Sequence, residues 1–171
     1  REALQVLVQE GLITSEPQKG KHVRQMTGKE IYDSYVVAGI LEGAGVAESL
    51  PLWTEANMET FRSVVRQMEG KISYATKLDE LAEIDELFHA TLFMACDNTR
   101  LVEMARTSCA TISKYLYYQH WITMFTPREY ADRHHAVAEA VYSRDVKHVE
   151  TALRDHYKET GLRMAQFGKE A

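Results

Sequence analysis

An aspartate and a histidine four residues apart, in the run Asp85-Glu86-Leu87-Phe88-His89, are the first candidates for chemistry in this sequence. On a helix, residues at this spacing lie on the same face, one turn apart. The face borders an apolar stripe with helical spacing, formed by Leu81, Ile84, Phe88 and Leu92. A carboxylate and an imidazole at the edge of a core need a partner, because an unpaired buried charge is costly. A metal ion would be such a partner if other helices supplied further ligands.

Two other segments bring histidines to apolar faces. His134 is in register with Tyr130, Val137, Ala138 and Val141, whereas His135 is rotated by about 100° and lies nearer the edge of that face. His156 shares its face with Val149, Ala152, Leu153 and Thr160. The candidate metal ligands are therefore three nitrogens and one oxygen, from Asp85, His89, His134 and His156. This set suits a divalent ion, zinc most of all, with nickel, manganese or cobalt as alternatives.

The competing interpretation is that these histidines are ordinary core residues with satisfied hydrogen bonds. For any one inward histidine, that interpretation is the more common outcome. Three histidines on three helices, with a carboxylate one turn from the first, are harder to explain in this way. The pattern alone leaves both interpretations open.

The periodicity of most of the chain predicts a mostly α-helical protein. Thr27-Gly28-Lys29-Glu30 has the form of a capping box, and Thr126-Pro127 is typical of a helix start. Six helices joined by short loops predict an antiparallel bundle over residues 28–171. The expected helices are Ile31 to Leu50, Thr54 to Gly70, Lys77 to Cys96, Thr99 to His120, a fifth from Pro127, and a sixth from Asp145 to Phe167.

The first 27 residues follow a different pattern. A helix ends at Gly11, and two short strands, 12–14 and 21–24, flank a turn that contains Pro17 and Gly20. Helix, strand, basic turn and strand form the second half of a winged helix-turn-helix. Lys19 and Lys21 are placed for phosphate contact. We therefore expect residues 1–27 to be the C-terminal part of a DNA-binding domain, preceded in the native protein by about 50 further residues.

Composition narrows the class of protein. A chain of 171 residues with 45% hydrophobic and 26% charged residues is typical of a soluble globular protein. No apolar run approaches the roughly 20 residues that are needed to cross a bilayer, so no membrane association is expected. Cys96 and Cys109 form no C-x-x-C pair, which favours a reduced, cytoplasmic protein. The net charge of −5 argues against a chain that coats nucleic acid, but not against a local basic patch.

Taken together, these motifs resemble the FadR branch of the GntR transcription regulators, whose C-terminal effector domain is called FCD. The N-terminal matches are the recognition helix and wing, at Arg1-Glu2-Ala3-Leu4, Glu10-Gly11-Leu12, Pro17 and Lys19-Gly20. The bundle matches are Leu41-Glu42, Asp85-x-x-x-His89, Asn98 with Leu101, His134 with Ala138-x-Ala140, and Arg144-Asp145 leading to His156. The 22-residue step from His134 to His156 also fits the family, which favours His134 over His135 as the ligand.

The resemblance implies a metal-dependent regulator that binds operator DNA as a homodimer and responds to a small carboxylate. Arg1, Lys19 and Lys21 would contact DNA. By helical register, the candidates for contact with the effector are Tyr35, Thr107, Ser108, Thr111 and Lys114. One departure concerns the arginine of the family's R-x-x-L-E motif, because Ala38 occupies that position here. Any role of that arginine in holding the effector's carboxylate must be moved or lost.

Two rival functions use the same ligands. A metal with open positions could activate water in a hydrolase-type enzyme. However, Asp132 and Glu139 fall off the face of His134, so the sequence offers no evident catalytic base. A metal that only clamps helices in a dimerisation domain is the other rival. We predict a regulator and not an enzyme.

Overall fold

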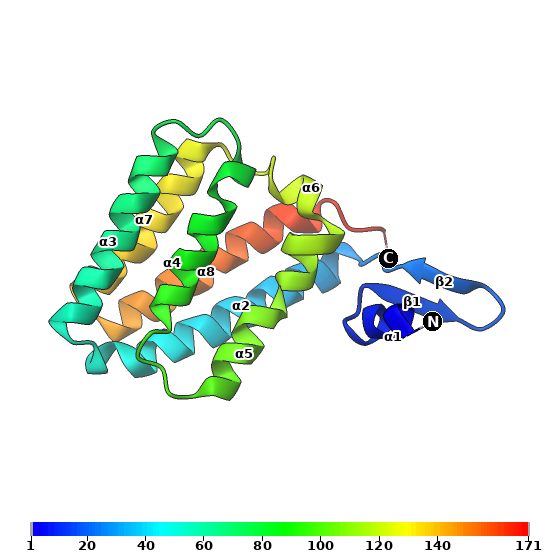
Figure 1. Ribbon diagram of the computed structural model, residues 1–171, viewed down its shortest axis with the longest axis horizontal. Coiled ribbons are helices and arrows are strands. Elements are labelled where there is room, and N and C mark those ends of the chain that lie inside the picture. The colour runs from blue at the N-terminus through cyan, green and yellow to red at the C-terminus, as the bar shows by residue number, and fades with distance from the viewer. Residues whose placement is uncertain (1, 171) are drawn as a thin grey trace.

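The computed structural model describes residues 2–170, which form a helical bundle with a small module at one end (Figure 1). The module consists of α1 (Glu2–Gln9), β1 (Ile13–Glu16) and β2 (Gly20–Val23). The bundle consists of α2 (Gly28–Ser49), the 3-10 turn η1 (Leu50–Leu52), α3 (Glu55–Ile72), the 3-10 turn η2 (Leu78–Leu81), α4 (Ala82–Leu92), α5 (Thr99–Ser108), the π-helical turn η3 (Thr111–Leu116), α6 (Tyr118–Trp121), α7 (Pro127–Ser143) and α8 (Val146–Ala165). The predicted fold class is confirmed.

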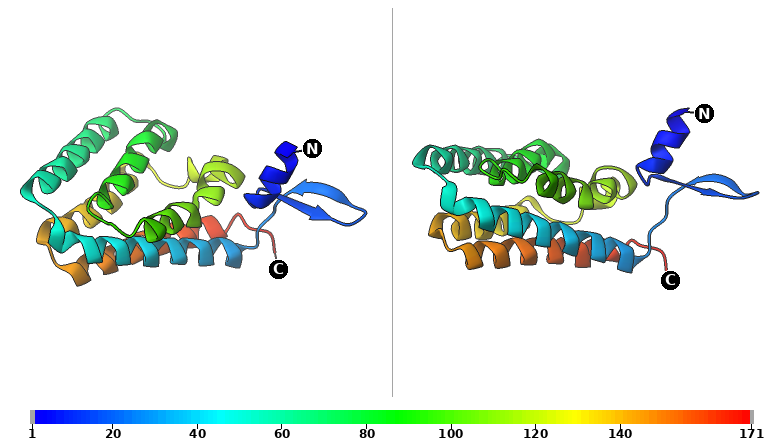
Figure 2. Two further views of the ribbon diagram at one scale, coloured as in Figure 1. Left: turned by 60° about the horizontal axis from the view of Figure 1, so that its bottom comes forward. Right: turned by 90° about the horizontal axis from the view of Figure 1, so that it is seen from below.

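The long helices α2 and α8 run side by side along the bundle, with α3 and α4 across from them (Figure 2). Two glycines allow the backbones of α2 and α8 to approach closely. A Cβ atom on Gly39 would lie 2.8 Å from Cβ of Tyr157, and one on Gly161 would lie 2.8 Å from Cβ of Tyr35. Both distances are shorter than normal van der Waals contact. The close approach therefore packs the two tyrosines between the central helices.

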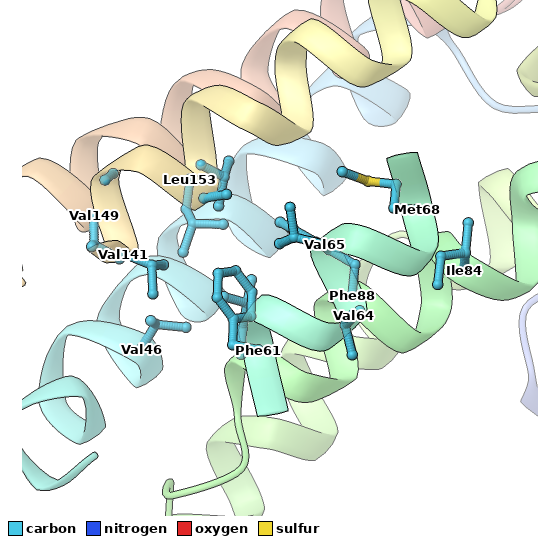
Figure 3. Close-up of a cluster of buried hydrophobic side chains, with 14 of the residues drawn as sticks. Val46, Phe61, Val64, Val65, Met68, Ile84, Phe88, Val141, Val149 and Leu153 are labelled. Atoms are coloured by element: carbon cyan, nitrogen blue, oxygen red, sulfur yellow. The ribbon is translucent and has the colours of Figure 1, made fainter. Parts of the chain in front are cut away.

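The main hydrophobic core lies between the two layers (Figure 3). Phe61 of α3 and Phe88 of α4 are fully buried, and their ring centroids are 5.3 Å apart. Val141 of α7 and Leu153 of α8 close the same cluster from the other layer. Burial of these large apolar side chains is the main stabilising contribution to the bundle.

The helix starts follow the expected local chemistry. Thr27 accepts a hydrogen bond from the backbone N–H of Glu30 (3.2 Å), and the Glu30 carboxylate accepts one from the backbone N–H of Thr27 (2.7 Å). This is the predicted capping box. Thr126 caps α7 in the same way, with Pro127 in the first turn. These caps set where α2 and α7 begin.

The predicted fourth helix, Thr99 to His120, is not continuous. α5 ends at Ser108, a π-helical turn covers Thr111–Leu116, and α6 is a single turn. The wider π-helical turn changes the angle between successive side chains, so an α-helical register cannot be extended through it. The predicted third helix is also shorter, because it opens with the 3-10 turn η2 and ends at Leu92.

In the module, β1 and β2 form an antiparallel hairpin that pairs Ile13 with Val23 and Glu16 with Gly20. Gly20 has φ 87°, a left-handed conformation that favours glycine. None of the residues of α1, Glu2–Gln9, is buried. The predicted helix, strand, turn and strand are present, and the module projects beyond the bundle (Figures 1 and 2).

A short junction joins the module to the bundle at Met26. The Tyr117 hydroxyl accepts a hydrogen bond from the Met26 backbone N–H (3.0 Å) and donates one to the Met26 carbonyl (3.2 Å). The backbone N–H of Lys169 donates to the same carbonyl at 2.9 Å. The junction is therefore bound to the segment after the π-helical turn and to the end of the chain beyond α8.

The expectation that no apolar run is long enough to cross a bilayer was wrong. By length and composition alone, the segment Gly28–Leu52 is long and apolar enough to cross a bilayer. Half of its most apolar window is buried inside the bundle, where α2 packs against α8. Its apolar character is explained by this central position, because a helix that is surrounded by others is apolar on most of its faces.

Candidate metal centre

Three histidines from three helices meet in the interior of the bundle. His89 of α4, His134 of α7 and His156 of α8 each offer a ligand atom, and these atoms all lie within 4.8 Å of one another. His134 and His156 are buried, and His89 is nearly so. His135 points elsewhere, since its side chain is 42% exposed and its Nε2 lies 3.3 Å from a Glu69 carboxylate oxygen. The structure thus places His134, and not His135, in the cluster.

Asp85 lies against the histidine cluster from α4. Its Oδ1 is 3.1 Å from Nε2 of His134 and 4.0 Å from Nε2 of His89. Burial by itself would raise the pKa of Asp85, but the hydrogen bond with His134 and the charge of His89 lower it overall. The carboxylate is therefore ionised. Asp85 lies beside His134 and His89, whereas the group of ligand atoms that are all close to one another consists of the three histidines.

The hydrogen bonds of His134 determine which of its nitrogens is free. Nδ1 lies 2.8 Å from the backbone carbonyl of Tyr130, which can only accept, so Nδ1 carries a proton. Nε2, which lies 3.1 Å from Oδ1 of Asp85, is then the nitrogen that can bind a metal once it carries no proton. Burial lowers the pKa of His134 although Asp85 raises it, which favours the neutral ring that a metal ligand requires.

His89 has a carboxylate behind it. Its Nδ1 is 2.6 Å from Oε1 of Glu42, which is buried on α2, and the Tyr157 hydroxyl donates to Oε2 of Glu42 at 2.8 Å. Burial opposes a charge on His89, but Glu42 more than offsets it and raises the pKa of His89 to about 9. Without a metal His89 is therefore protonated at neutral pH, and a metal at Nε2 would displace that proton. A carboxylate that orients a histidine through Nδ1 is a common arrangement around bound metals.

The sequence interpretation missed this role of Glu42, which it treated only as part of a motif. The available signal was a glutamate in the middle of an apolar helix, a position where an acidic residue needs a buried partner.

His156 completes the set of imidazoles. Its Nδ1 is buried and has no hydrogen-bond partner among residues 2–170. Burial, followed by the positive charge of Arg133, lowers the pKa of His156 well below the usual value. The ring is therefore neutral, with a buried nitrogen that lacks a partner, which is the state that a metal ligand requires.

The donor set fits a divalent transition metal. Neighbouring ligands on an ion with bonds of about 2.1 Å are separated by roughly 3–3.4 Å, and the distance between Asp85 Oδ1 and His134 Nε2 lies in this range. Three imidazoles and one carboxylate suit zinc, nickel, cobalt or manganese. With four protein ligands, an ion that accepts five or six retains positions for another oxygen donor.

The predicted effector contacts differ in their burial and in their hydrogen bonds. Tyr35 is buried, and its hydroxyl has no hydrogen-bond partner within the part of the chain that the structure describes. Thr107 is exposed, and its hydroxyl donates to the Glu103 carbonyl of its own helix. Ser108 likewise donates to the Met104 carbonyl. The inward placement of Thr107 was wrong, because the buried residue of α5 is Ala105, and Thr107 lies two residues further, about 200° around the helix.

The remaining effector candidates lie on the π-helical turn. Thr111 is partly buried, and Lys114 is 50% exposed and pairs with Glu86 of α4 at 3.0 Å. Lys114 therefore links the π-helical turn to α4 on the surface and does not point into the cluster. Of the five candidates, Tyr35 is the one whose polar atom is buried and without a partner.

The predicted DNA contacts are on the module. Lys19 lies in the hairpin turn, 75% exposed, with its Nζ 3.0 Å from Glu16. Lys21 is exposed on β2. Arg1 lies outside the described residues. The two lysines are free to reach a phosphate backbone, since an exposed ion pair such as that of Lys19 is weak.

A buried arginine near the cluster was not predicted from the sequence. The side chain of Arg133, next to His134, is only 12% exposed, and its Nε donates to Glu159 at 2.9 Å. Its Nη2 donates to the His156 carbonyl and to the Thr160 hydroxyl. On a helical wheel this residue borders the solvated face, so helical periodicity does not predict its burial.

Comparison with known proteins agrees with this architecture. The family model of the FCD domain matches residues 33–159. The chain is 25% identical over 173 residues to the HTH-type transcriptional repressor RspR of Escherichia coli K12, covering 99% of this chain and 74% of that protein. Among solved structures, E. coli McbR/YncC superposes with a TM-score of 0.76 at 16% identity, covering 97% of this chain and 78% of that one.

A GntR family member from Pseudomonas syringae pv. tomato DC3000 superposes with a TM-score of 0.67 at 21% identity, covering 98% of this chain and 68% of the other. The curated relatives are named as transcriptional regulators, which confirms the expectation of a regulator and not an enzyme. Because the FCD model spans most of the chain, the protein belongs to the FCD-domain family of GntR-type transcription regulators.

Proposed function

We propose that this regulator depends on a bound divalent metal, responds to a small carboxylate and binds operator DNA as a homodimer. The observation that carries the proposal is the meeting of His89, His134 and His156, whose ligand atoms lie within 4.8 Å of one another, with a carboxylate oxygen of Asp85 3.1 Å from Nε2 of His134. A metal ion bound to these nitrogens could also be bound by that carboxylate. Zinc is the first candidate, with nickel, manganese and cobalt as alternatives.

In the metal-loaded protein, Asp85, His89, His134 and His156 hold the ion. Glu42 orients His89, and the Tyr130 carbonyl orients His134. The ion supplies a Lewis-acidic centre to which a carboxylate oxygen can bind. Tyr35 is the predicted effector contact that fits best, and Thr107, Ser108, Thr111 and Lys114 become secondary candidates.

We assign residues 1–27 to the DNA-binding domain and residues 28–171 to the metal- and effector-binding domain. In DNA binding, Arg1, Lys19 and Lys21 are the proposed contacts, and a homodimer is needed because an operator with two half-sites requires a two-fold particle. Binding to operator DNA would place the protein in the cytoplasm, without a role at a membrane. Effector binding would change the relative placement of the two DNA-binding domains.

The first test is metal content followed by ligand response. After removal of metal by chelation and reloading, we expect one ion per chain, with zinc retained most tightly. Thermal unfolding would then be recorded with sugar acids, hydroxy acids and dicarboxylates. A shift that requires the metal supports a sensor. Metal without any ligand response would indicate a structural clamp in a dimerisation domain, and turnover of any of these acids would indicate a metalloenzyme of the hydrolase type.

A second measurement concerns DNA. Binding to operator DNA should fall steeply with salt, because lysine contacts release counterions from phosphates. Replacing Lys19 and Lys21 by alanine should make this dependence shallower. Binding that is independent of salt would contradict the proposed contacts.

A further inference from the structure

Helix α2 carries an apolar strip on the face that points away from the bundle. Its outermost side chains are Val37, which is 46% exposed, and Ile40, which is 41% exposed. Ala44 and Ala47, one and two turns further along, are partly buried. Seen from below, α2 runs along the outside of the bundle between α5 and α8 (Figure 2, right). Apolar side chains that are exposed at successive turns of one helix indicate that this face binds a partner.

The bundle buries only part of the apolar surface of this helix. The segment Gly28–Leu52 is long and apolar enough to cross a bilayer, yet only half of its most apolar window is buried. The buried faces are those toward the neighbouring helices, where Gly39 lies against Tyr157 of α8 and Gly45 lies against Leu101 of α5. The central position of α2 accounts for these inward faces. The outer strip needs an explanation of its own.

The strip has the residue spacing of a seam between two helices. Steps of four, three, four and three residues separate its members, which are Asp33, Val37, Ile40, Ala44 and Ala47. This alternation is the repeat with which two helices pack along each other at a small crossing angle. Branched side chains occupy the middle of the strip, and the two alanines allow a close approach at its C-terminal end. The strip therefore fits a second helix that lies along α2.

The two ends of the strip carry opposite charges. Lys29, whose side chain is 81% exposed, lies at the N-terminal end, and Glu48 is exposed at the C-terminal end. On ideal helix geometry, both lie within about 50° of the midline of the strip. Lys29 also contacts Asp33 of its own helix, but an exposed ion pair of this kind is weak. Antiparallel packing of two copies of α2 would bring opposite charges together at both ends, whereas parallel packing would oppose like charges.

We propose that the homodimer forms by antiparallel packing of α2 against α2 of a second copy, with the two-fold axis between residues 38 and 39. This inference rests on the homodimer of the proposed function, and it names the surface that forms it. An axis at this point lies halfway between Lys29 and Glu48, so that Lys29 of each copy faces Glu48 of the partner subunit. The same axis places Val37 of each copy against Ile40 of the partner subunit.

The antiparallel arrangement also suits a regulator that contacts two half-sites. The module precedes α2, so each copy carries it beyond the N-terminal end of its own α2 (Figure 1). With a rise of about 1.5 Å per residue, the two N-terminal ends of α2 would be about 31 Å apart along the helices. Half-sites one turn of DNA apart are separated by roughly 34–36 Å. The proposed dimer therefore holds the two modules at a separation of the order that an operator requires.

The test is the oligomeric state of the chain, measured by sedimentation velocity over a range of protein concentrations. The wild type should be a dimer. Ile40→Glu would bury two unpaired carboxylates in one interface and should raise the dissociation constant of the dimer by at least about a hundredfold. Leu87→Glu is the matched control, because Leu87 is 42% exposed but lies on α4, in the layer across from α2. It should change the dissociation constant by less than about twofold.

A charge exchange tests the register without altering the apolar strip. Lys29→Glu and Glu48→Lys should each weaken the dimer by roughly three- to tenfold, because each brings like charges together at two points of the interface. The double variant should regain the affinity of the wild type. Both substitutions suit the helix dipole, so a loss would not reflect unfolding of α2. In a parallel pair, like charges would face each other before and after each single substitution, so the absence of any loss would overturn the antiparallel arrangement.

The outcomes separate this inference from the function on which it rests. A wild-type dimer that persists unchanged in Ile40→Glu would overturn the α2 interface and leave the homodimer to another surface. A monomeric wild type would show that the homodimer itself is wrong, and its cosedimentation with phosphatidylglycerol vesicles would assign the strip to a membrane surface. If circular dichroism shows that Ile40→Glu does not fold, Ile40→Ala should still weaken the dimer by about tenfold, and an unchanged dimer would again overturn the interface.

Discussion

The bundle and the N-terminal module are stabilised in different ways. In the bundle, side chains such as Phe61 and Phe88 are completely buried, and the histidine cluster is built on helices that share this core. In the module, no residue of Glu2–Gln9 is buried, and neither strand of the β1–β2 hairpin contains a buried residue. A lone two-stranded hairpin is marginally stable in water. The bundle therefore determines its own geometry, whereas the module takes its position from the junction at Met26.

This contrast shows that metal binding and DNA contact place different demands on the elements that carry them. Ligands that must meet within a few ångströms are placed on packed helices, where side-chain rotamers are fixed. Lysines that contact a phosphate backbone tolerate a mobile support, because the interaction is long-ranged and not directional. The effects of substitutions in the bundle and in the module should accordingly differ in kind and in size.

The largest expected effect is on metal binding in the bundle. His134→Ala removes a ligand with a fixed lone pair and should abolish stoichiometric binding, whereas His135→Ala should leave it nearly intact because that ring pairs with Glu69 outside the cluster. Metal content after gel filtration would measure both. The opposite result would show that α7 is rotated relative to this description.

The next effect is on folding. Phe61→Ala empties a completely buried site and should lower the free energy of unfolding by about 3–5 kcal/mol. Leu4→Ala, on the partly exposed face of α1, should change it by less than about 0.5 kcal/mol. Urea unfolding followed by circular dichroism gives both values. Similar losses would mean that the module is part of the same cooperative core.

A smaller effect on metal affinity is expected from the residues that orient the candidate ligand His89. Glu42→Gln keeps the shape of the side chain but removes the charge beside His89, and it should weaken metal affinity by about 10–100-fold. Tyr157→Phe removes only the hydroxyl that donates to Glu42 and should weaken it less. Competition with a chromogenic chelator measures both. An unchanged affinity in Glu42→Gln would assign the pair a purely structural role.

The smallest effect, on the free energy of unfolding, is expected at Thr27, where the module meets the bundle. Thr27→Ala removes the cap of α2 and should cost about 1 kcal/mol of unfolding free energy. Thr60→Ala is the matched control, because its hydroxyl only bonds the Ala56 carbonyl one turn earlier within α3. Chemical unfolding of both variants under one condition provides the comparison. A loss in Thr60→Ala as large as that in Thr27→Ala would show that the cap contributes nothing specific.

Much of the fold and of the candidate metal site could be predicted from the sequence, for identifiable reasons. Capping residues such as Thr27 and Thr126 act locally, so they can be recognised without a structure. The inward register of His134 followed from the 3.6-residue period of α7, and the structure agrees. Register reasoning failed at Thr107, because only a narrow face of α5, at Ala105, is buried, and it could not have been carried beyond Ser108, where α5 gives way to a π-helical turn.

Other features depend on contacts between distant segments. Glu42 lies 47 residues from His89 in sequence, and Arg133 bonds groups on α8 that are more than 20 residues away. Periodicity within one helix cannot reveal which buried polar residues of two helices will meet. The meeting of the three candidate histidines was therefore predictable from the sequence, whereas the groups that orient them were not.

The two hydrogen bonds between Tyr117 and Met26 have a mechanical consequence. Tyr117 directly follows the π-helical turn Thr111–Leu116, whose Ile112 packs in the same small cluster as Tyr35. A tilt of that turn would move the junction at Met26, from which the β1–β2 hairpin extends, and the hairpin would act as a lever arm. A displacement too small to disturb the core would then become a larger displacement at the hairpin turn.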